Sequence, residues 1–424
     1  MNPWGYRFLT RIAYPVLFPW LAWKYREGLA ERRGFFRPEV EAVGARRPFW
    51  IHAVSVGEVQ SALPLITAMR SGSCPWPVLL STITATGKEM ALQELGDLID
   101  AHVYYPWDVP GIVNRALDRL CPRIYVVMET EIWPNLLLEL EKREIPAYMV
   151  NARISEATFR RAVRDKAFWS RVLGTFRGIF ARSAEDEERI LEMGANPARV
   201  FRVGDSKVDA LARRKKNSDR SSLDPVMEGK GPVFIGGSTH PGEEEAVLAA
   251  FAEVRQTLPE CRLILAPRHP ERAEAVLGLA LGHGPAWLLS KWFPGWTILV
   301  VDRIGVLFDL YGHCDAAFIG GSLVPKGGQN LLEPLAWGVP TLHGPHMEDF
   351  MDLADRAAKA GLTRKAETPR EIASGWIASV LPKEERISFA TRCGAFLESV
   401  GGASAKAWER IEAENKKILW EVST

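Results

Sequence analysis

Short, continuously apolar runs alternate with amphipathic stretches along most of this chain, and they do so in two successive series. An apolar run without polar alternation is typical of a strand that is buried on both faces of a parallel sheet. Parallel neighbours need a crossover of about a dozen residues between them, which is usually a helix. The expected strands are 48–54, 78–83, 124–128, 147–150 and 178–181 in the first series, and 233–236, 262–266, 297–301, 316–319 and 340–342 in the second.

The two series predict an α/β protein with two Rossmann-like, parallel-sheet domains and a cleft between them. A polar and basic stretch from Ala212 to Lys230 separates the series, and we expect it to be an exposed connector. The tail after about residue 384 predicts helix, because charged side chains recur there at four-residue spacing. The expected divisions are an N-terminal segment 1–27, a first domain 28–206, and a second domain 207–424 that includes the C-terminal helices.

Composition narrows the class of protein. Lys and Arg number 53 and Asp and Glu 52, which gives a formal net charge of +1 and argues against a nucleic-acid binder. The chain is 47% hydrophobic and 25% charged, so it is a globular rather than a disordered protein. Its five cysteines are scattered without metal-ligand spacing, which argues against a disulfide scaffold and a structural zinc site. We therefore expect a reducing, cytoplasmic compartment, no nucleic-acid partner and no structural zinc site.

The N-terminal segment combines a local excess of positive charge with a short apolar stretch. Its first fifty residues hold nine Arg or Lys against four Asp or Glu. The uncharged stretch from Ile12 to Trp23 contains Pro15 and Pro19 and falls short of the ~20 residues that a membrane-spanning helix needs. Aromatic rings beside Arg and Lys favour a segment that lies at the membrane surface. A buried core helix and a cleaved signal peptide are the alternatives, although bulky Trp23 and Tyr25 do not suit a cleavage site.

Glycine-rich loops in the second series indicate an anion site. Gly320–Ser322 follows one expected strand, and Gly327–Asn330 precedes the helical stretch 331–337. Glycines at such positions let backbone N–H groups approach a phosphate, while the helix N-terminus adds partial positive charge. A simple tight turn is the alternative. The dinucleotide fingerprint and the P-loop motif are both missing. Glu333 is placed to accept hydrogen bonds from a ribose diol, or else to stabilise the helix dipole.

Two further loops, Gly236–Glu244 and Ala266–Pro270, also follow expected strands. The carboxyl ends of strands are where ligands bind in open α/β sheets. Arg268 suits pairing with a phosphate or a carboxylate. His269 lies between two prolines and is either a ligand contact or a cap of the turn.

Several blocks of the sequence resemble, in order, the 3-deoxy-D-manno-oct-2-ulosonic acid (Kdo) transferase family. In the first half they are His-Ala-Val-Ser-Val-Gly-Glu at 52–58, Thr-Ala-Thr-Gly-Lys at 84–88, Glu-Thr-Glu-Ile-Trp-Pro-Asn at 129–135 and Asn-Ala-Arg-Ile-Ser at 151–155. In the second half they are Pro-Arg-His-Pro at 267–270, Gly-Gly-Ser-Leu at 320–323, Gly-Gly-Gln-Asn-Leu-Leu-Glu-Pro at 327–334 and His-Gly-Pro at 343–345.

The resemblance implies a GT-B fold and an inverting, metal-independent glycosyltransferase. The donor would be CMP-Kdo, with no other cofactor, and the acceptor would be the lipid A precursor lipid IVA. The implied location is the cytoplasmic face of the bacterial inner membrane, as a peripheral or monotopic protein held by its N-terminus.

The resemblance also assigns roles to individual residues. Glu31, in Ala-Glu-Arg-Arg-Gly at 30–34, resembles the catalytic base; without the resemblance, a surface ion pair with Arg32 or Arg33 would be the simpler interpretation. The expected donor-binding residues are Lys207, Arg268, His269, Ser322, Gly328, Asn330 and Glu333. The residues expected on the acceptor side are Ser55, Gly57, Glu58, Glu129, Glu131 and Arg153.

Some positions depart from the family pattern. The departures are Asp205, Val306, Gln329, Leu331 and Asp349, where the family usually has Asn, an acidic residue, His, Pro and Asn. They keep two alternatives open. One is a related GT-B transferase for another acidic nucleotide sugar or lipid acceptor. The other is a non-catalytic protein that binds a nucleotide sugar.

Overall fold

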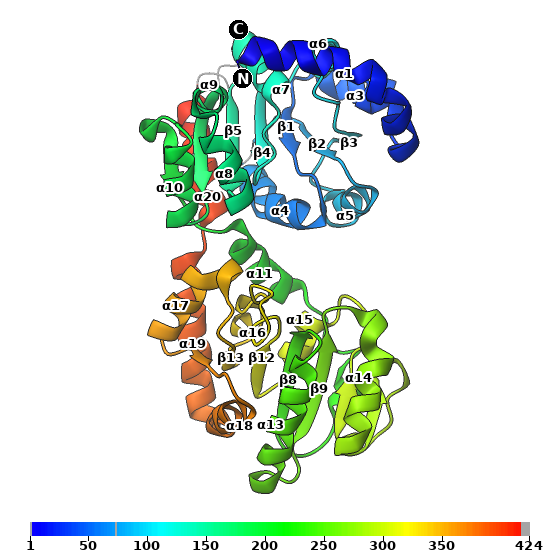
Figure 1. Ribbon diagram of the computed structural model, residues 1–424, viewed down its shortest axis with the longest axis vertical. Coiled ribbons are helices and arrows are strands. Elements are labelled where there is room, and N and C mark those ends of the chain that lie inside the picture. The colour runs from blue at the N-terminus through cyan, green and yellow to red at the C-terminus, as the bar shows by residue number, and fades with distance from the viewer. Residues whose placement is uncertain (1, 73, 417–424) are drawn as a thin grey trace. The chain divides into compact units, whose positions relative to one another are not determined.

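A computed structural model of the chain describes residues 2–72 and 74–416 (Figure 1). The chain forms two compact units. Unit 1 contains the residues up to Ala210 and again those from Val400, and unit 2 contains Leu211–Ser399. Each unit is built on a seven-stranded sheet whose neighbouring strands are all parallel. The predicted α/β class with two parallel sheets is therefore confirmed.

The sheet of unit 1 has the strand order β3-β2-β1-β4-β5-β6-β7. Its central strands are completely buried because helices cover both faces, as the continuous apolar runs predicted. The strands are β1 Phe49–His52, β2 Val78–Thr82, β3 Ala101–Tyr104, β4 Ile124–Met128, β5 Ala147–Ala152, β6 Phe176–Ala181 and β7 Val200–Arg202.

Helices connect these strands and fill the two layers of unit 1 (Figure 1). Those of the N-terminal half are α1 Pro3–Lys24, α2 Leu29–Arg32, α3 Pro38–Ala45, α4 Val56–Ser71, α5 Ala85–Leu95 and α6 Pro110–Leu120. They are followed by α7 Pro134–Lys142, α8 Glu156–Val163, α9 Lys166–Leu173, α10 Ala184–Glu192, the 3₁₀ helix η1 Pro197–Arg199, and finally α20 Ala403–Glu414.

Helix α20 corrects the expected domain division. We expected the C-terminal helices to belong to the second domain, yet α20 packs in the core of unit 1 against α4 and β5. Trp408 is 4% exposed and meets Phe49 edge-on, with ring centroids 5.7 Å apart. Asp209 accepts hydrogen bonds from the N–H groups of Gly402 and Ser404 and so caps the helix. The sequence pattern predicted the helix but carried no information about which sheet it covers.

Helix α1 lies across α6, α7 and α9 within unit 1 (Figure 1). Tyr6 donates a hydrogen bond to the Asp108 carboxylate at 3.1 Å, and Tyr14 packs on Trp107. None of its residues is buried, so the buried core helix considered above is wrong. Its outer side carries large exposed apolar residues, namely Trp4, Phe8, Leu9, Ile12, Val16, Leu17, Trp20 and Trp23. No helix among the described residues combines the length and the apolar character needed to cross a membrane.

The sheet of unit 2 has the strand order β10-β11-β9-β8-β12-β13-β14. Its strands are β8 Val233–Thr239, β9 Arg262–Pro267, β10 Ala286–Leu288, β11 Ile298–Val300, β12 Ala316–Ile319, β13 Thr341–His343 and β14 Thr363–Lys365. Helix α11 Ser206–Asn217 begins in unit 1 and continues into unit 2. The further helices of unit 2 are α12 Asp224–Met227, α13 Glu243–Thr257, α14 Ala273–Ala280, α15 Leu307–Tyr311, α16 Leu332–Ala336, α17 Met351–Lys359, α18 Pro369–Ala378 and α19 Lys383–Val400, with 3₁₀ helices η2 Pro270–Arg272, η3 Leu281–His283, η4 Leu289–Lys291 and η5 Glu348–Phe350.

The basic stretch expected to be an exposed connector is largely helical. Its first residues continue α11, and Asp224–Met227 forms α12. Two of its cations contact aromatic rings of unit 2: the Arg214 guanidinium lies 4.3 Å from the Phe308 ring and the Arg220 guanidinium 4.6 Å from the Trp337 ring. Most of its described residues are exposed, as expected, and the stems of its long basic side chains cover apolar surface.

Candidate functional site

Glu31 lies at the carboxyl end of the unit 1 sheet, beside its edge strand β3. Helix α2 carries it and begins after Gly28, where a φ of 69° and the close approach of Tyr104 favour glycine. One carboxylate oxygen accepts a hydrogen bond from the Tyr104 N–H at 2.7 Å, and the other lies 3.7 Å from Nε of Arg37. The side chain is 14% exposed. The carboxylate is thus held in place while its second oxygen remains available.

Neither Arg32 nor Arg33 forms the ion pair with Glu31 that was the alternative interpretation. Arg32 is buried, donates to the carbonyl oxygen of Ile83 at 2.6 Å, and lies over the Tyr104 ring. Arg33 lies over the ring of Phe18. Between these described residues there is no carboxylate–guanidinium contact within 4.0 Å, and the arginine that approaches Glu31 is Arg37, at 3.7 Å.

Three carboxylates and one ammonium gather at the ends of β1 and β4; we call them the Glu58 cluster. Glu58 accepts a hydrogen bond from the Val54 N–H at 2.6 Å, and Glu129 pairs with Nζ of Lys207 at 3.1 Å. Burial raises the pKa of Glu58 to about 8, with further contributions from Glu129 and Glu131. Burial also raises the pKa of Glu131. Two strand spacings, about 10 Å, separate β3 from β1.

The raised pKa of Glu58 predicts a pH dependence of stability. The folded state holds the proton of Glu58 more tightly than the unfolded state does, so the protonated side chain adds to the unfolding free energy. This added stability is complete below the ordinary pKa of Glu and is lost as pH rises to about 8. We expect the wild-type protein to lose roughly 2–4 kcal/mol more unfolding free energy than Glu58→Gln between pH 5 and pH 8.5. Urea denaturation at both pH values measures the difference. Equal losses in the two proteins would contradict it.

The remaining residues expected on the acceptor side also lie at the carboxyl ends of strands. Ser55 and Gly57 form the start of α4, and a Cβ at Gly57 would meet no atom within 4 Å, so the backbone there is open. Arg153 follows β5, and its carbonyl oxygen accepts a hydrogen bond from the hydroxyl of Thr130. Lys207, expected at the start of the second domain, belongs to unit 1. Unit 1 therefore brings together Lys207 and all six predicted acceptor residues at the carboxyl ends of its strands.

In unit 2 an internal carboxylate occupies the loop that was expected to bind a donor anion. Glu243, the first residue of α13, is completely buried. Its two oxygens accept hydrogen bonds from the N–H groups of His240, Gly321, Ser322 and Leu323, at 2.7–2.9 Å. A carboxylate held by several N–H groups is the arrangement predicted for a phosphate in this loop. The N–H groups of this turn do surround an anion, as predicted, but that anion is the Glu243 side chain and not a ligand.

The prediction that Ser322 binds the donor is also corrected, because its polar groups bond within the fold. Its side chain is completely buried, its hydroxyl donates to the carbonyl oxygen of Ile319, and the N–H of Gly344 donates to it at 2.7 Å. All polar groups of Ser322 are thus used within the fold, including its carbonyl oxygen, which accepts from the N–H of His346. The residue shapes the loop and does not present its hydroxyl to a ligand.

The second glycine-rich loop keeps its predicted position before α16. Gly328 has a φ of 78°, and a Cβ there would lie 2.4 Å from Sδ of Met347, so the position favours glycine. Its N–H donates to the carbonyl oxygen of Gly321, which ties the two loops together. The Asn330 side chain accepts from the N–H of Leu332 at 3.1 Å and so caps the start of the helix.

Arg268 and His269 follow β9 and are both exposed. The Arg268 N–H donates to the carbonyl oxygen of Thr239, which fixes the loop beside the end of β8. The His269 ring meets the His240 ring edge-on with centroids 6.0 Å apart. Burial lowers the pKa of His240, and its buried Nε2 has no hydrogen-bond partner among the described residues. Two imidazoles and a guanidinium therefore stand at neighbouring strand ends.

Glu333 lies on α16 close to two cations. Arg214 from α11 approaches its carboxylate at 3.6 Å, and the side chain is 22% exposed. Burial raises the pKa of Glu333, and the positive charges of Arg214 and Arg268 oppose that shift. Unit 2 thus brings Arg268, His269 and Glu333 to the carboxyl ends of its strands. Among the described residues, no group of three or more His, Cys, Asp or Glu side chains is arranged to hold a metal ion.

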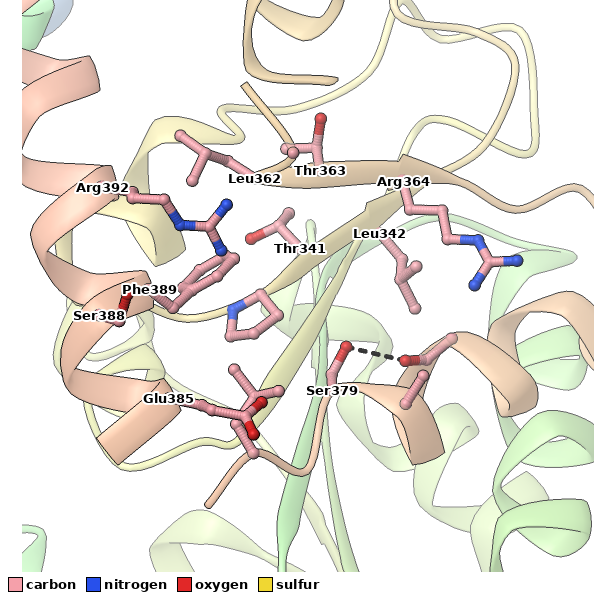
Figure 2. A pocket seen from close by; sticks show the side chains of 15 residues that line it. Thr341, Leu342, Leu362, Thr363, Arg364, Ser379, Glu385, Ser388, Phe389 and Arg392 are labelled. Atoms are coloured by element: carbon pink, nitrogen blue, oxygen red, sulfur yellow. Dashed lines mark hydrogen bonds between the residues drawn. The ribbon is translucent and has the colours of Figure 1, made fainter. Parts of the chain in front are cut away.

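Figure 2 shows a pocket at the amino ends of strands of the same sheet. Its volume is about 370 Å³. It is lined by Thr341 and Thr363 at the starts of β13 and β14, and by Phe389 and Arg392 of α19. Because the predicted donor residues lie at the carboxyl ends of strands, this pocket is not part of the candidate site.

Sequence reasoning missed three residues that shape the unit 2 site. Glu243 and His240 lie in the loop Gly236–Glu244 that follows an expected strand, but neither was among the predicted site residues. Arg214 was counted with the connector. A buried acidic residue at the start of a helix gives no signal in the sequence that separates it from ordinary charge at a helix N-terminus.

Comparisons with known proteins agree with this arrangement. A family model described as 3-deoxy-D-manno-octulosonic-acid transferase (kdotransferase) matches residues 27–210. A Haemophilus influenzae protein named 3-deoxy-D-manno-octulosonic acid transferase is 33% identical over 334 residues, which are 78% of this chain and 78% of that protein. A protein of the same name from Bordetella pertussis is 30% identical over 429 residues, which are 96% of this chain and 98% of that protein.

Solved structures share the fold. UDP-GlcNAc 2-epimerase from Neisseria meningitidis matches with a TM-score of 0.61 at 14% identity, covering 86% of this chain and 100% of that one. A glycosyltransferase from Rickettsia africae matches with a TM-score of 0.61 at 11% identity, covering 88% of this chain and 100% of that one. At these identities the likeness concerns the fold alone. Together with the two parallel sheets, it confirms the expected GT-B class.

Proposed function

The chain belongs to the 3-deoxy-D-manno-octulosonic acid (Kdo) transferase family of glycosyltransferases, and from this membership we propose that it transfers Kdo from CMP-Kdo to a lipid A precursor, lipid IVA. The observation that carries the proposal is the extent of the relationship. The alignment with the Bordetella pertussis relative spans 96% of this chain, so both units have counterparts in a protein of that name. Glu31, Arg268 and Glu333 stand at the carboxyl ends of their sheets, where ligands of α/β folds bind.

In the proposed reaction, a sugar hydroxyl of the acceptor attacks the anomeric carbon of Kdo. The bond from that carbon to the phosphate oxygen of CMP breaks, and its electron pair leaves with CMP. Glu31 accepts the hydroxyl proton. Arg268 stabilises the negative charge that develops on the departing CMP. A single displacement from the opposite face inverts the anomeric centre.

The protein's own cations would serve the leaving group, so we propose that the reaction needs no metal ion. Arg268 is exposed at a strand end, and Arg214 lies beside Glu333, whose carboxylate is available to the ribose. Transfer that persists unchanged in excess EDTA supports this part of the proposal. Loss of activity that Mg²⁺ restores would contradict it.

Arg268→Ala is expected to weaken CMP binding roughly 10–150-fold, because a hydrogen bond to a charged group contributes about 1.5–3 kcal/mol. Isothermal titration with CMP measures the change. Arg392→Ala is the matched control, since it removes the same charge from the pocket at the amino ends of the strands. Equal affinities in Arg268→Ala and the wild-type protein would remove Arg268 from the donor site.

Helix α1 is the proposed means of attachment to the cytoplasmic face of the inner membrane. Its exposed side presents Trp4, Phe8, Ile12, Trp20 and Trp23, and aromatic and apolar side chains next to Arg and Lys suit the headgroup region. The acceptor would then reach the protein from the bilayer to which α1 binds.

Mass spectrometry of the lipid product tests the proposed function. The purified protein is incubated with a Kdo-activating system, CTP and tetraacylated lipid A precursor. A mass increase of one or more Kdo units establishes the reaction and counts the additions. CMP binding without any Kdo increment would mean a different sugar or acceptor.

Another acidic nucleotide sugar is the second candidate donor, because two of the family departures lie near the loops of unit 2. Gln329 lies beside Gly321, and Val306 caps α15 without the hydrogen bond that an acidic side chain would accept there. A panel of CMP-linked acidic sugars in the same assay distinguishes the two donors. A protein that binds CMP and transfers none of them would be the non-catalytic alternative.

A further inference from the structure

Unit 1 contains a pocket of about 560 Å³ between α1 and the first turn of α6. Four arginines line it, namely Arg7 and Arg11 of α1, Arg33 after α2, and Arg115 of α6. Its volume falls within the range of about 300–1,000 Å³ that is usual for sites of small molecules. None of these arginines is among the residues to which a role was assigned above.

The positive charge of this pocket is largely uncompensated. Arg7 lies 3.7 Å from Glu139, but the same carboxylate also faces Lys142 at 3.6 Å and Arg143 at 3.3 Å. In the part of the chain that the structure describes, Arg11, Arg33 and Arg115 have no carboxylate within 4.0 Å. Like charges held at one pocket repel each other, so an anion bound there would be stabilised.

The arginines are also held in position. Nη1 of Arg115 donates to the carbonyl oxygen of Arg33 at 2.8 Å. The guanidinium groups of Arg115 and Arg33 lie 4.4 Å and 5.8 Å from the ring of Phe35. Part of the entropy of fixing these side chains is therefore already spent before a ligand binds.

The shape of guanidinium groups favours phosphate as the anion. A guanidinium presents paired N–H donors that match two oxygens of a phosphate, and a phosphate monoester carries nearly two negative charges. The pocket also includes Val109–Ile112, where the eleven-residue helix α6 begins, and the positive end of the helix dipole adds to the attraction. Pro110 has no N–H, and the N–H of Ile112 already donates to the carbonyl oxygen of Val109.

The neighbouring surface points to a lipid. Arg7, Arg11 and Tyr14 follow one another at helical spacing on the side of α1 that lines the pocket, while Phe8 and Ile12 next to them are 67% and 54% exposed. A phosphate in the pocket would thus sit beside apolar side chains that suit acyl chains.

We propose that this pocket binds the phosphate group of a phosphorylated lipid, which on the proposed function is a phosphate of the lipid acceptor. Phosphate of bulk anionic phospholipid is the same chemistry from a second source, and the experiment separates the two.

The test uses the full chain with phosphatidylcholine vesicles of three kinds. The first contain the bisphosphorylated tetraacyl lipid A precursor, the second the same precursor lacking one phosphate, and the third phosphatidylglycerol. Arg11→Ala and Arg115→Ala are compared with Arg161→Ala, which removes an exposed charge from α8 of the same unit. Co-sedimentation gives the binding, and KM for the acceptor is measured alongside. We expect each pocket variant to bind the first vesicles about fivefold more weakly than Arg161→Ala does.

The pattern of loss identifies the source of the phosphate. A loss confined to the bisphosphorylated precursor, with a raised KM and little change in kcat, indicates the acceptor. A loss that extends to phosphatidylglycerol indicates bilayer lipid. Binding of all three vesicles equal to that of Arg161→Ala would overturn the proposal. Failure of the proposed function is distinct, because it would be seen as the absence of Kdo transfer by the wild-type protein, whatever the vesicle binding.

Discussion

Replacing Glu31 by Gln is expected to lower kcat for Kdo transfer by about 10²–10⁴-fold, which is the usual contribution of a general base. Gln keeps an oxygen that can accept from the Tyr104 N–H, so the local fold is retained while the proton acceptor is lost. KM for the acceptor should change little. Steady-state rates with CMP-Kdo and the lipid precursor, at saturating donor, measure the effect.

Glu39→Gln is the matched control. Glu39 is an exposed carboxylate in the first turn of α3, eight positions from Glu31, and its replacement should leave the rate within a factor of two to three. A rate for Glu31→Gln that lies close to this control would mean that another group accepts the proton. Glu58 would then be the next residue to test, because its pKa of about 8 suits proton transfer near neutral pH.

Trp408→Ala is expected to destabilise unit 1 by about 3–5 kcal/mol, as the loss of a buried aromatic side chain usually does. Trp408 belongs to the core cluster that contains Phe49 and Ile51 of β1 and Leu80 of β2. Hydrogen exchange of the full chain should therefore show faster exchange of the β1 and β2 amides. The amides of β8 and β12 in unit 2 should keep their protection, because neither strand belongs to this cluster.

Trp376→Ala gives the mirror-image control. Trp376 is completely buried in unit 2 and stacks on Phe234 of β8 with ring centroids 5.0 Å apart. Its loss should accelerate exchange in β8 and β12 and spare β1 and β2. If Trp408→Ala weakened β8 and β12 instead, the assignment of α20 to unit 1 would be wrong.

Ten of the fourteen strands in the described part of the chain were predicted from apolar runs, and the four that were missed are the edge strands of the two sheets. These are β3 and β7 in unit 1, and β10 and β14 in unit 2. An edge strand has one neighbour and tolerates polar residues, as in Thr-Arg-Lys of β14, two of whose three residues are exposed. The continuous apolar pattern marks only strands that are covered on both faces, so edges escape it.

The candidate site was predictable where it follows strand ends and unpredictable where it depends on distant pairing. The carboxyl ends of β1, β4 and β9 carry Glu58, Glu129 and Arg268 as the alternation implied. The use of Glu243 to hold a loop 78–80 positions further along the chain depends on the neighbouring positions of β8 and β12, which no local pattern contains. The same applies to Arg214 and Glu333, which lie on separate helices.

The origin of α20 has a consequence for biosynthesis. A ribosome makes the chain from its N-terminus, and domains generally begin to fold in that order. The sequence of unit 2 is complete at Ser399, whereas the unit 1 core still lacks Ala407, Trp408 and Ile411 at that stage. The unit that emerges first from the ribosome is therefore the last to complete its core, and until then the apolar surface of α4 that α20 covers remains available to chaperones.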